Sequence, residues 1–398
     1  MIFQTLDSKA ECFGYFVENE LVFDNIPKNL SGTWKYTPSV ASLRGNLDYA
    51  YIVSGGKTLE ESCPEHMLED WVQAENVMKA FFRSFAHAKV SLDEHCFYDM
   101  VPEKFLIQYY GLRNRITEHV LQSTAQPENC EFLSSVHEML ATIASQKLNV
   151  NPNELKSNFH QLKTRNFFKK ILKINPYVRY NMFGSKTGRL TNIKGSFPVL
   201  TLDTAHRNIL SPTNDLFVEL DYNGAEIRTL LALSGKDQPK NDIHKWNVEN
   251  VARGFTTRDK MKERFFAWLY NPKAQDEMIE RHYDKDVVGD FWDGSVITTP
   301  YGRRMDADAH HSLNYLIQST TSDMVLENAL KIFEYLSGKK TKIAFTVHDS
   351  VVLDFAADEE QHLSPILELF EETRFGTFKA NVSGGKKYGN LKEMTWRR

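Results

Sequence analysis

Two strand-like segments, far apart in the chain, each carry an aspartate where a strand would end. Residues 216–222 read Leu-Phe-Val-Glu-Leu-Asp-Tyr and contain Asp221, and residues 343–353 place Asp349 between two apolar runs. Such β-branched and aromatic runs predict strands. One aspartate of this kind is usually a turn residue or a helix cap. Two such segments on adjacent strands would set two carboxylates side by side, which strongly limits how the chain can fold.

A pair of strand-end carboxylates suits magnesium. Mg²⁺ binds proteins through one or two carboxylates, keeps some of its water and takes its remaining ligands from substrate phosphates. Two such ions, about 3.5–4 Å apart, can stabilise both the attacking and the leaving oxygen of an in-line displacement. The two aspartates therefore indicate metal-dependent phosphoryl transfer.

Residues 258–270, between the two aspartates, have a regular spacing of functional side chains. Arg258, Lys262, Phe266 and Tyr270 recur every four residues, which would align two cations and two aromatic rings on one helix face. The structural alternative is an amphipathic helix with core aromatics and solvated cations. In the functional interpretation, the cations bind a triphosphate while the rings cover its base and sugar.

Composition limits the class of protein. With 398 residues, 41% of them hydrophobic, the chain can bury a large core and form more than one domain. No run approaches the roughly 18 apolar residues that cross a bilayer. The first residues lack the basic start of a signal peptide, so we expect a protein of the bacterial or infected-host cytoplasm with no membrane partner. The cysteines are far apart and form no C-x-x-C pair, which disfavours zinc and disulfides. They are Cys12, Cys63, Cys96 and Cys130.

The net charge of -4 disfavours a nucleic-acid partner, but the charges are unevenly distributed. The stretch from residue 156 to residue 194 contains no acidic residue. Its cations are Lys156, Lys163, Arg165, Lys169, Lys170, Lys173, Arg179, Lys186, Arg189 and Lys194. A solvated helix face is the alternative. Because aromatic residues are interspersed with these cations, we interpret the stretch as packed on one side and bound to a phosphate backbone on the other.

Hydrophobic periodicity predicts the organisation of the rest. We expect strands at residues 1–6, 12–17 and 49–53, followed by a helix at residues 67–88. Residues 102–174 read as mostly helical, with Asn151 and Pro152 starting the basic helix. Beyond residue 187, short strands and helices alternate.

Taken in chain order, these motifs resemble those of the family A DNA polymerases, typified by bacterial polymerase I. The resemblance runs from about residue 150 to the C-terminus. The matching segments are T-G-R-L at 187–190, D-Y-N-G-A-E-I-R at 221–228, D-I-H at 242–244, R-x3-K-x3-F-x3-Y at 258–270, G-R-R at 302–304, N-x3-Q at 314–318, V-H-D at 347–349 and the final turn at 382–389.

The resemblance implies an α+β right-hand fold of palm, fingers and thumb, preceded by a small mixed α/β domain. Residues 1–100 would form this accessory or degenerate exonuclease-like domain and residues 101–185 a mostly helical thumb region. Residues 186–398 would form the palm, with the fingers inserted at about 235–300. The implied activity is template-directed addition of deoxynucleotides to a primer 3′ end. The implied partners are primer-template DNA, deoxynucleoside triphosphates and replication proteins.

Residue roles follow from the same resemblance. Asp221 and Asp349 would be catalytic and would hold two Mg²⁺ ions with the backbone carbonyl of Tyr222. The nucleotide would be bound by His244, Arg258, Lys262, Phe266, Tyr270 and Glu226. The DNA would be contacted by Arg189, Asn314, Gln318, His348, Lys156, Lys163, Lys169 and Lys170.

The chain also departs from the family pattern. Asn223 and Gly224 replace serine and glutamine, and Ser350 replaces an acidic residue. The segment between Tyr270 and Gly302 is short, which implies reduced fingers. A proofreading exonuclease needs D-x-E on a first strand, and the N-terminal region lacks that spacing, since its candidates are Asp7, Glu11 and Asp99.

Other functions remain as alternatives. Within the same fold, the chain could be a non-proofreading repair or lesion-bypass polymerase, or a relative of single-subunit RNA polymerases. Glu226 disfavours the RNA polymerase, because a bulky side chain beneath the sugar leaves no room for a 2′-hydroxyl. Residues 54–58, Ser-Gly-Gly-Lys-Thr, resemble the end of a phosphate-binding loop, but Tyr51 stands where its first glycine is needed, so a plain turn is expected.

Overall fold

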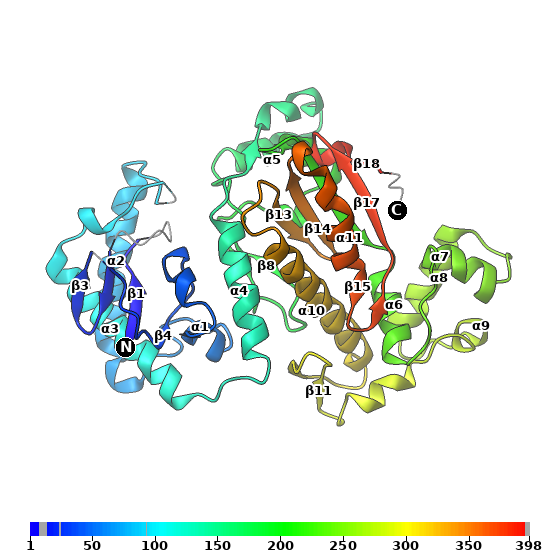
Figure 1. Cartoon of the computed structure of the whole chain (residues 1–398), viewed down its shortest axis with the longest axis horizontal. Helices are drawn as coiled ribbons and strands as arrows, with labels where there is room; N and C mark the ends of the chain where they lie inside the picture. Colours follow the sequence, from blue (N-terminus) through cyan, green and yellow to red (C-terminus); the bar gives the residue numbers. More distant parts are fainter. Residues whose placement is uncertain (8–13, 24, 93, 395–398) are drawn as a thin grey trace. The chain divides into compact units, whose positions relative to one another are not determined.

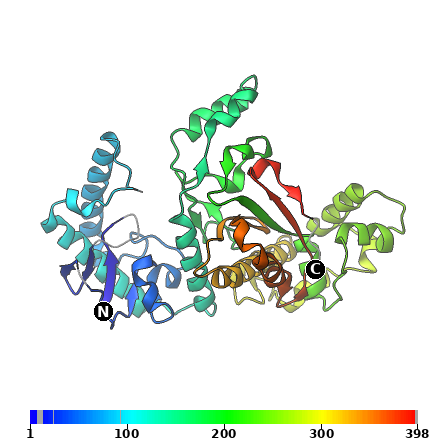
Figure 2. The ribbon, with the colours of Figure 1, turned by 45° about the horizontal axis from the view of Figure 1, so that its top comes forward.

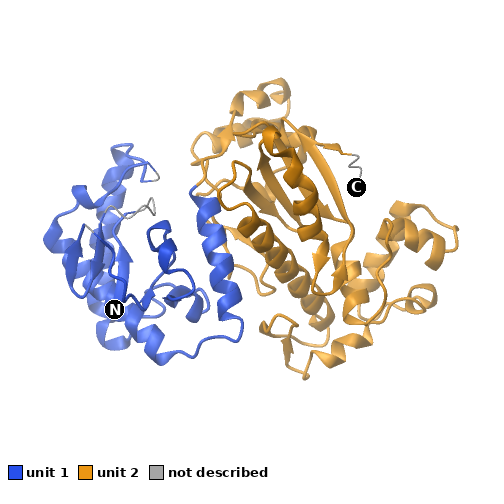
Figure 3. Ribbon diagram, in the orientation of Figure 1, with its two compact units in different colours: residues 1–145 blue, residues 146–398 orange. Residues whose placement is uncertain are grey.

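The computed structural model describes residues 1–7, 14–23, 25–92 and 94–394. The chain divides into two compact units, residues 1–145 and 146–398 (Figure 3). The division does not fall at the expected boundary near residue 100, because the next two helices pack within the first unit. Helix α3 (Glu103–Ser123) packs against the first strand and helix α2, and α4 (Cys130–Ala144) packs against α1.

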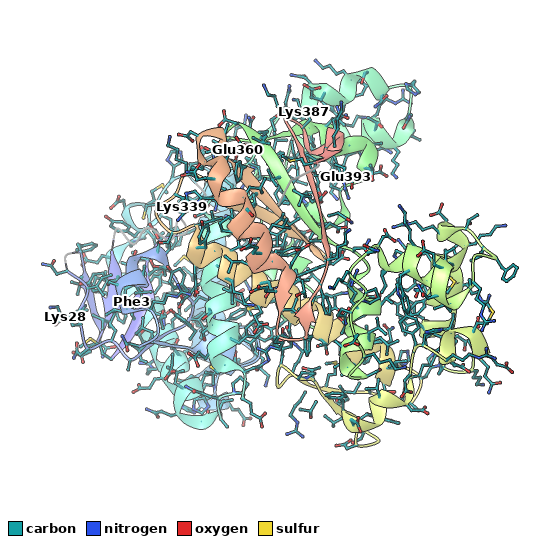
Figure 4. All side chains as sticks on the ribbon, turned by 45° about the vertical axis from the view of Figure 1, so that its right-hand side comes forward. Phe3, Lys28, Lys339, Glu360, Lys387 and Glu393 are labelled. Carbon is teal, nitrogen blue, oxygen red and sulfur yellow. The ribbon has the colours of Figure 1, made fainter. Side chains whose placement is uncertain are left out.

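The first unit is built on a five-stranded sheet of order β3-β2-β1-β4-β5. Its strands are β1 (Ile2–Thr5), β2 (Tyr15–Val17), β3 (Glu20–Val22), β4 (Gly32–Thr33) and β5 (Asp48–Tyr49). Strand β1 is antiparallel to β2 and parallel to β4. Phe3 on β1, labelled in Figure 4, is fully buried. The helices of this unit are η1 (Pro38–Leu43), α1 (Ala50–Val53), α2 (Glu65–His87) and η2 (Tyr98–Met100), together with α3 and α4.

The strand expected at residues 49–53 is wrong. Only Asp48–Tyr49 pairs as a strand, and Ala50–Val53 forms one helical turn, closed by the Ser54 backbone N–H donating to the Ala50 carbonyl at 2.9 Å. All four residues of the turn are buried. A short apolar run gives no periodicity that separates a buried strand from a buried helix. The expected helix at residues 67–88 is confirmed as α2, whereas Glu11 and Cys12 lie outside the described residues.

The second unit is organised by an antiparallel sheet of order β13-β14-β10-β17-β18. These strands are β10 (Leu216–Tyr222), β13 (Lys342–Val347), β14 (Ser350–Phe355), β17 (Ala380–Gly385) and β18 (Lys392–Glu393). Helices α10 (Ser312–Tyr335) and α11 (Leu363–Glu371) lie against one face of the sheet (Figure 1). Helix α6 (Ala225–Leu233) follows β10 and packs on α10. The unit therefore mixes helices with an antiparallel sheet, as the α+β class requires.

The elements within residues 243–306 pack against α6 and α10, in a core that includes Phe265 and Trp268 and in a smaller one that includes Ile297 and Met305. Its elements are α7 (Ile243–Trp246), the π-helix η6 (Asn247–Val251), α8 (Arg258–Tyr270), α9 (Glu277–Glu280), η7 (Asp286–Asp290), β11 (Val296–Thr298) and β12 (Arg304–Asp306).

The expected basic helix is two shorter elements, the 3₁₀ helix η3 (Pro152–Asn158) and α5 (Leu162–Ile171). Asn151 caps η3 as expected, since its side chain accepts from the Asn153 N–H. This segment projects from the second unit in Figure 2. The small elements that complete the unit are β6 (Asn149–Val150), β7 (Tyr180–Asn181), β8 (Thr191–Asn192), η4 (Val199–Thr201), η5 (Thr204–Ile209), β9 (Leu210–Ser211), η8 (Ala357–His362), β15 (Glu372–Thr373), β16 (Gly376–Thr377) and η9 (Tyr388–Asn390).

Among the described residues, none of the helices is both long enough and apolar enough to cross a bilayer.

The core of the second unit predicts a stability difference between two phenylalanines. Phe345 on β13 is fully buried and meets Phe217 edge to face at 5.9 Å, whereas Phe255 is 89% exposed. We expect Phe345→Ala to lower the free energy of unfolding of this unit by about 3–5 kcal/mol, because the truncation leaves a cavity. Phe255→Ala should leave it within about 0.5 kcal/mol. Urea denaturation of both variants measures the difference, and equal stabilities would contradict this core.

Candidate active site

The end of β10 and the β13–β14 hairpin bring the two predicted aspartates to one place. Asp221 lies opposite Ser350 in the β10–β14 register, and Asp349 occupies the two-residue turn just before Ser350. The Tyr222 backbone N–H donates to the Asp349 carbonyl at 3.4 Å. His348, the other turn residue, has a φ of 52°, the left-handed conformation that two-residue hairpins favour. Both carboxylates thus lie at the same end of adjacent strands.

The two aspartates line a cavity of about 460 Å³. Among its other lining residues are Arg189, Tyr222, Glu226, His244, Arg258, Lys262, Phe266, His348 and Asn381. The structure therefore brings most of the expected metal and nucleotide residues together. Tyr270, Asn314 and Gln318 lie outside this lining, although Tyr270 contacts two of its members.

The cavity places two partly buried carboxylates close to each other. Burial, the nearby Asp349 charge and the Glu219 charge raise the pKa of Asp221 to about 7, against a smaller opposing effect of Lys262. Burial also raises the pKa of Asp349. Within the described ranges, neither carboxylate forms an ion pair with a protein cation. Two like charges of this kind are stabilised by a bound cation.

The donor set fits a magnesium site that is completed by a substrate. In the part of the chain that the structure describes, no three His, Cys, Asp or Glu side chains converge closely enough to hold a metal ion unaided. Asp221 and Asp349 are oxygen donors, and the pocket beside them is wide enough to admit phosphate and water oxygens. Mg²⁺ sites of this type take only one or two protein carboxylates.

Helix α8 presents separate core and cavity faces. Met261, Phe265 and Trp268 are at most 2% exposed and pack in the core, whereas Arg258, Lys262 and Phe266 line the cavity. The start of the helix is capped by Thr257, whose hydroxyl accepts from the Lys260 N–H at 3.4 Å. The rings of Phe266 and Tyr270 stack with centroids 5.7 Å apart. Arg258, Lys262 and Phe266 thus share the cavity face of the helix, and Phe266 also packs against the edge of the core.

Glu226 links three of the expected residues. It lies in the first turn of α6 and accepts hydrogen bonds from the Tyr270 hydroxyl and the Arg189 guanidinium. Gln318 also hydrogen-bonds Tyr270. The Glu226 carboxylate is therefore fixed against the cavity wall beneath the aromatic end of α8.

The Asn223 and Gly224 departures are explained by the turn that follows β10. The Asn223 side chain accepts from the Ile243 N–H at 2.7 Å and donates to the Asp242 carboxylate at 2.9 Å. Gly224 has a φ of 66°, and a Cβ there would approach the Ile243 side chain to 2.5 Å. A glutamine at 224 would meet this close approach as well as the strained φ. Asn223 and Gly224 thus allow the turn after β10 to pack directly against the start of α7.

The same contacts fix the basic side of the cavity. Asp242 pairs with Arg258 at 2.9 Å. Burial alone would raise the pKa of Asp242, but hydrogen bonds from Arg258, the Lys245 N–H and Asn223 hold it below its usual range. His244 is 4% exposed, and burial, reinforced by Arg258 and Lys262, lowers its pKa to about 4. His244 is therefore neutral near pH 7.

The four lysines expected to bind DNA lie outside the cavity. Lys156, Lys163, Lys169 and Lys170 are exposed on η3 and α5. Lys163 pairs with Asp203 at 2.5 Å. Lys387, labelled in Figure 4, pairs with Glu154 at 3.2 Å and ties η3 to the residues after β17.

Sequence reasoning missed three residues of this site. Asn381 lies opposite Asp221 on β17, Asp242 holds Arg258, and Glu219 lies two residues before Asp221 on the same strand. Glu219 had a sequence signal, because side chains two apart on a strand share a face, and Asp242 had one as the first residue of the D-I-H segment, whereas Asn381 had none.

Comparisons with known proteins agree with this geometry. No family model matches the chain. It is 28% identical over 85 residues to DNA polymerase I of Borreliella burgdorferi, covering 20% of this chain and 9% of that protein. It is 25% identical over 221 residues to the DNA polymerase of Mycobacterium phage D29, covering 45% of this chain and 35% of that one. The chain thus matches well under half the length of either relative.

A solved structure shows the same fold. The POL domain of Pol1 from M. smegmatis, in complex with DNA primer-template and dNTP, matches with a TM-score of 0.58 at 12% identity. The match covers 85% of this chain and 81% of that one. The fold is that of a polymerase domain, in agreement with the expected α+β right-hand class. Its sequence relatives are DNA polymerases and its structural neighbour is a polymerase domain, which agrees with the resemblance of its motifs to those of the family A DNA polymerases.

The raised pKa of Asp221 predicts a pH dependence of stability. Its pKa is about 7 in the folded protein against 3.8 as the ordinary value, so the protonated form is favoured by folding. Its contribution to stability is therefore fully present below about pH 4 and is lost as pH rises towards about 7. In EDTA, Asp221→Asn should flatten the fall in unfolding temperature across this range. Identical pH profiles for the parent and the variant would contradict the assignment.

Proposed function

We propose that this chain is a template-directed DNA polymerase that adds deoxynucleotides to a primer 3′ end. The observation that carries the proposal is the convergence of Asp221 and Asp349 in one cavity with the cavity face of α8. Two carboxylates facing two cations, Arg258 and Lys262, suit a substrate that brings both metal and triphosphate. The polymerase relatives and the polymerase-domain fold support this choice of reaction.

Asp221, Asp349 and the backbone carbonyl of Tyr222 would hold two Mg²⁺ ions, which when bound neutralise charge on the attacking and leaving oxygens. The Tyr222 side chain has a structural role instead: it is 1% exposed, and its ring stacks on that of Phe370 with centroids 4.1 Å apart. The protein itself supplies positioning. The two carboxylates fix the reaction point at the end of the sheet, and the cavity wall orients the substrate around it.

The triphosphate would be bound by Arg258, Lys262 and His244. Arg258 is held by Asp242 in this structure, so phosphate oxygens would compete with that carboxylate for the guanidinium. His244, neutral near pH 7, would donate a single hydrogen bond without adding charge. Phe266, stacked on Tyr270, would cover the base.

DNA contacts are proposed at two places. Arg189, Asn314, Gln318 and His348 would meet the new base pairs, where acceptors shared by all pairs report shape rather than sequence. The exposed lysines at 156, 163, 169 and 170 would contact the phosphate backbone, as part of a thumb region. Residues 235–300 would act as short fingers, and residues 1–100 as an accessory or degenerate exonuclease-like domain.

A relative of RNA polymerases is the main competing function, and Glu226 disfavours it. Its carboxylate is fixed by Tyr270 and Arg189 at the cavity wall, so it cannot swing away from an incoming sugar without losing both hydrogen bonds. A fixed side chain at that place would exclude a 2′-hydroxyl.

The metal assignment predicts that Asp221→Asn and Asp349→Asn each abolish primer extension while DNA affinity stays nearly intact. Each change keeps the shape of the side chain and removes the charge that a divalent cation needs. Asp358→Asn is the matched control, because its side chain is 60% exposed and pairs with Lys340. Extension of a labelled primer in Mg²⁺, with DNA binding measured separately, tests this. Near-parental extension by either site variant would show that the assignment is wrong.

The fixed Glu226 carboxylate predicts sugar selection. Glu226→Ala should open space below the sugar and raise ribonucleotide incorporation by about 10-fold or more relative to deoxynucleotide, a difference of about 1.4 kcal/mol. Glu249→Ala, an exposed glutamate on η6, should leave selection unchanged. Single-turnover incorporation of each sugar by the parent and both variants gives the ratio. An unchanged ratio in Glu226→Ala would refute the steric exclusion.

A further inference from the structure

A third carboxylate lies beside the two aspartates. Glu219 is two residues before Asp221 on β10, so both side chains project from the same face of the strand. Leu220 between them is fully buried on the opposite face. Glu219 is not part of the cavity lining. It precedes Asp221, which lines the cavity, by two residues on β10.

Glu219 is held in place by the charge of Arg207 and by two hydroxyl donors. The Ser350 hydroxyl contacts the Glu219 carboxylate at 3.3 Å, and the same hydroxyl lies 3.0 Å from the Val347 carbonyl. The Tyr388 hydroxyl also bonds Glu219, while Arg207 lies 4.9 Å from the centroid of the Tyr388 ring. The Arg207 charge and the two hydroxyls lower the pKa of Glu219, but burial outweighs them and keeps that pKa above its ordinary value. Within the described ranges, Glu219 forms no ion pair of its own.

This arrangement is unfavourable for the fold alone. A partly buried carboxylate near two others adds like-charge repulsion, and the Arg207 charge and the hydroxyl hydrogen bonds offset the penalty of burial and repulsion only in part. A neutral residue of similar shape would keep the contacts with Ser350 and Tyr388 without that repulsion. A divalent cation bound at the two aspartates would make this third negative charge favourable.

Ser350 connects Glu219 to the turn that carries Asp349. Ser350 is 3% exposed, follows Asp349 directly and lies opposite Asp221 in the strand register. Ser350 stands directly after the second aspartate, Asp349. The carboxylate that contacts its hydroxyl is that of Glu219, on the neighbouring strand β10. A glutamate at 350 would project from the same face towards the place that Glu219 occupies.

We propose that Glu219 is a positioning residue of the metal centre, supplying negative charge behind Asp221 and steadying the Asp349 turn through Ser350. It raises the affinity of the aspartate pair for divalent cations without binding the cation itself. This inference rests on the proposed two-metal site, and its test distinguishes the failure of one from the failure of the other.

The decisive variant is Glu219→Gln, which keeps a hydrogen-bond acceptor for Ser350 and Tyr388 but removes the charge. The readout is Mn²⁺ binding, measured by electron paramagnetic resonance of free Mn²⁺, to the protein with dideoxy-terminated primer-template and the next nucleotide. No turnover occurs in this complex. We expect affinity to fall by about 10-fold, the loss typical of residues that support metal ligands. Glu372→Gln, an exposed glutamate on β15, is the matched control and should bind Mn²⁺ like the parent.

A charge-relocation variant separates charge from structure. Glu219→Ser combined with Ser350→Glu returns one carboxylate to the site from β14, and it should recover most of the lost affinity. Recovery supports the proposal. Where recovery fails, the metal-free unfolding temperature of Glu219→Gln decides: a value equal to or above that of the parent supports a charge role, and a lower value shows a structural role and overturns the proposal.

Two further outcomes are decisive. Parental Mn²⁺ affinity in Glu219→Gln overturns the role of Glu219 when Asp221→Asn still loses binding in the same assay. Parental affinity in both variants shows instead that the metal site, and with it the proposed function, is misplaced.

Discussion

The antiparallel pairing of β10 with β14 is the constraint on which the site depends. The register sets Asp221 opposite Ser350, and the two-residue turn adds Asp349 directly beside them. A slip of one residue would turn Asp221 towards the opposite face of the sheet. Helices α10 and α11 support this pairing. Tyr222 stacks on Phe370 of α11, and Asn328 of α10 donates to both the Tyr222 hydroxyl and the Phe370 carbonyl. The sheet and its helices thus offset the repulsion between the carboxylates at its end.

The second requirement is that α8 faces those carboxylates with its cations. Its core face buries Phe265 and Trp268, which sets the rotation of the helix and leaves Lys262 on the cavity side. Its start is tied through Asp242 and Asn223 to the turn after β10. The carboxylate strand and the cation helix are therefore joined by a continuous set of hydrogen bonds. The two departures from the family sequence, at 223 and 224, lie within this connection.

Much of this site could be predicted from the sequence because its signals are local. A strand that ends in an aspartate and a four-residue spacing of cations and rings each fix a side-chain direction without knowledge of the rest of the fold. Other features needed the structure. The turn at Ala50–Val53 has no distinguishing periodicity, and the packing of α3 against β1, which moves the division between the units, is a contact between distant segments. The Asn223–Asp242 bond and the Ser350–Glu219 contact likewise join residues from different elements.

Asp221 and Asp349 are proposed to form a two-metal site together. Anomalous diffraction from a crystal of the protein with dideoxy-terminated primer-template, a matching nucleotide and Mn²⁺ tests it most directly. The account predicts two Mn²⁺ peaks about 3.5–4 Å apart, each bound by one or both of these aspartates. Mn²⁺ bound elsewhere in the chain, with no peak at this pair of aspartates, would contradict it.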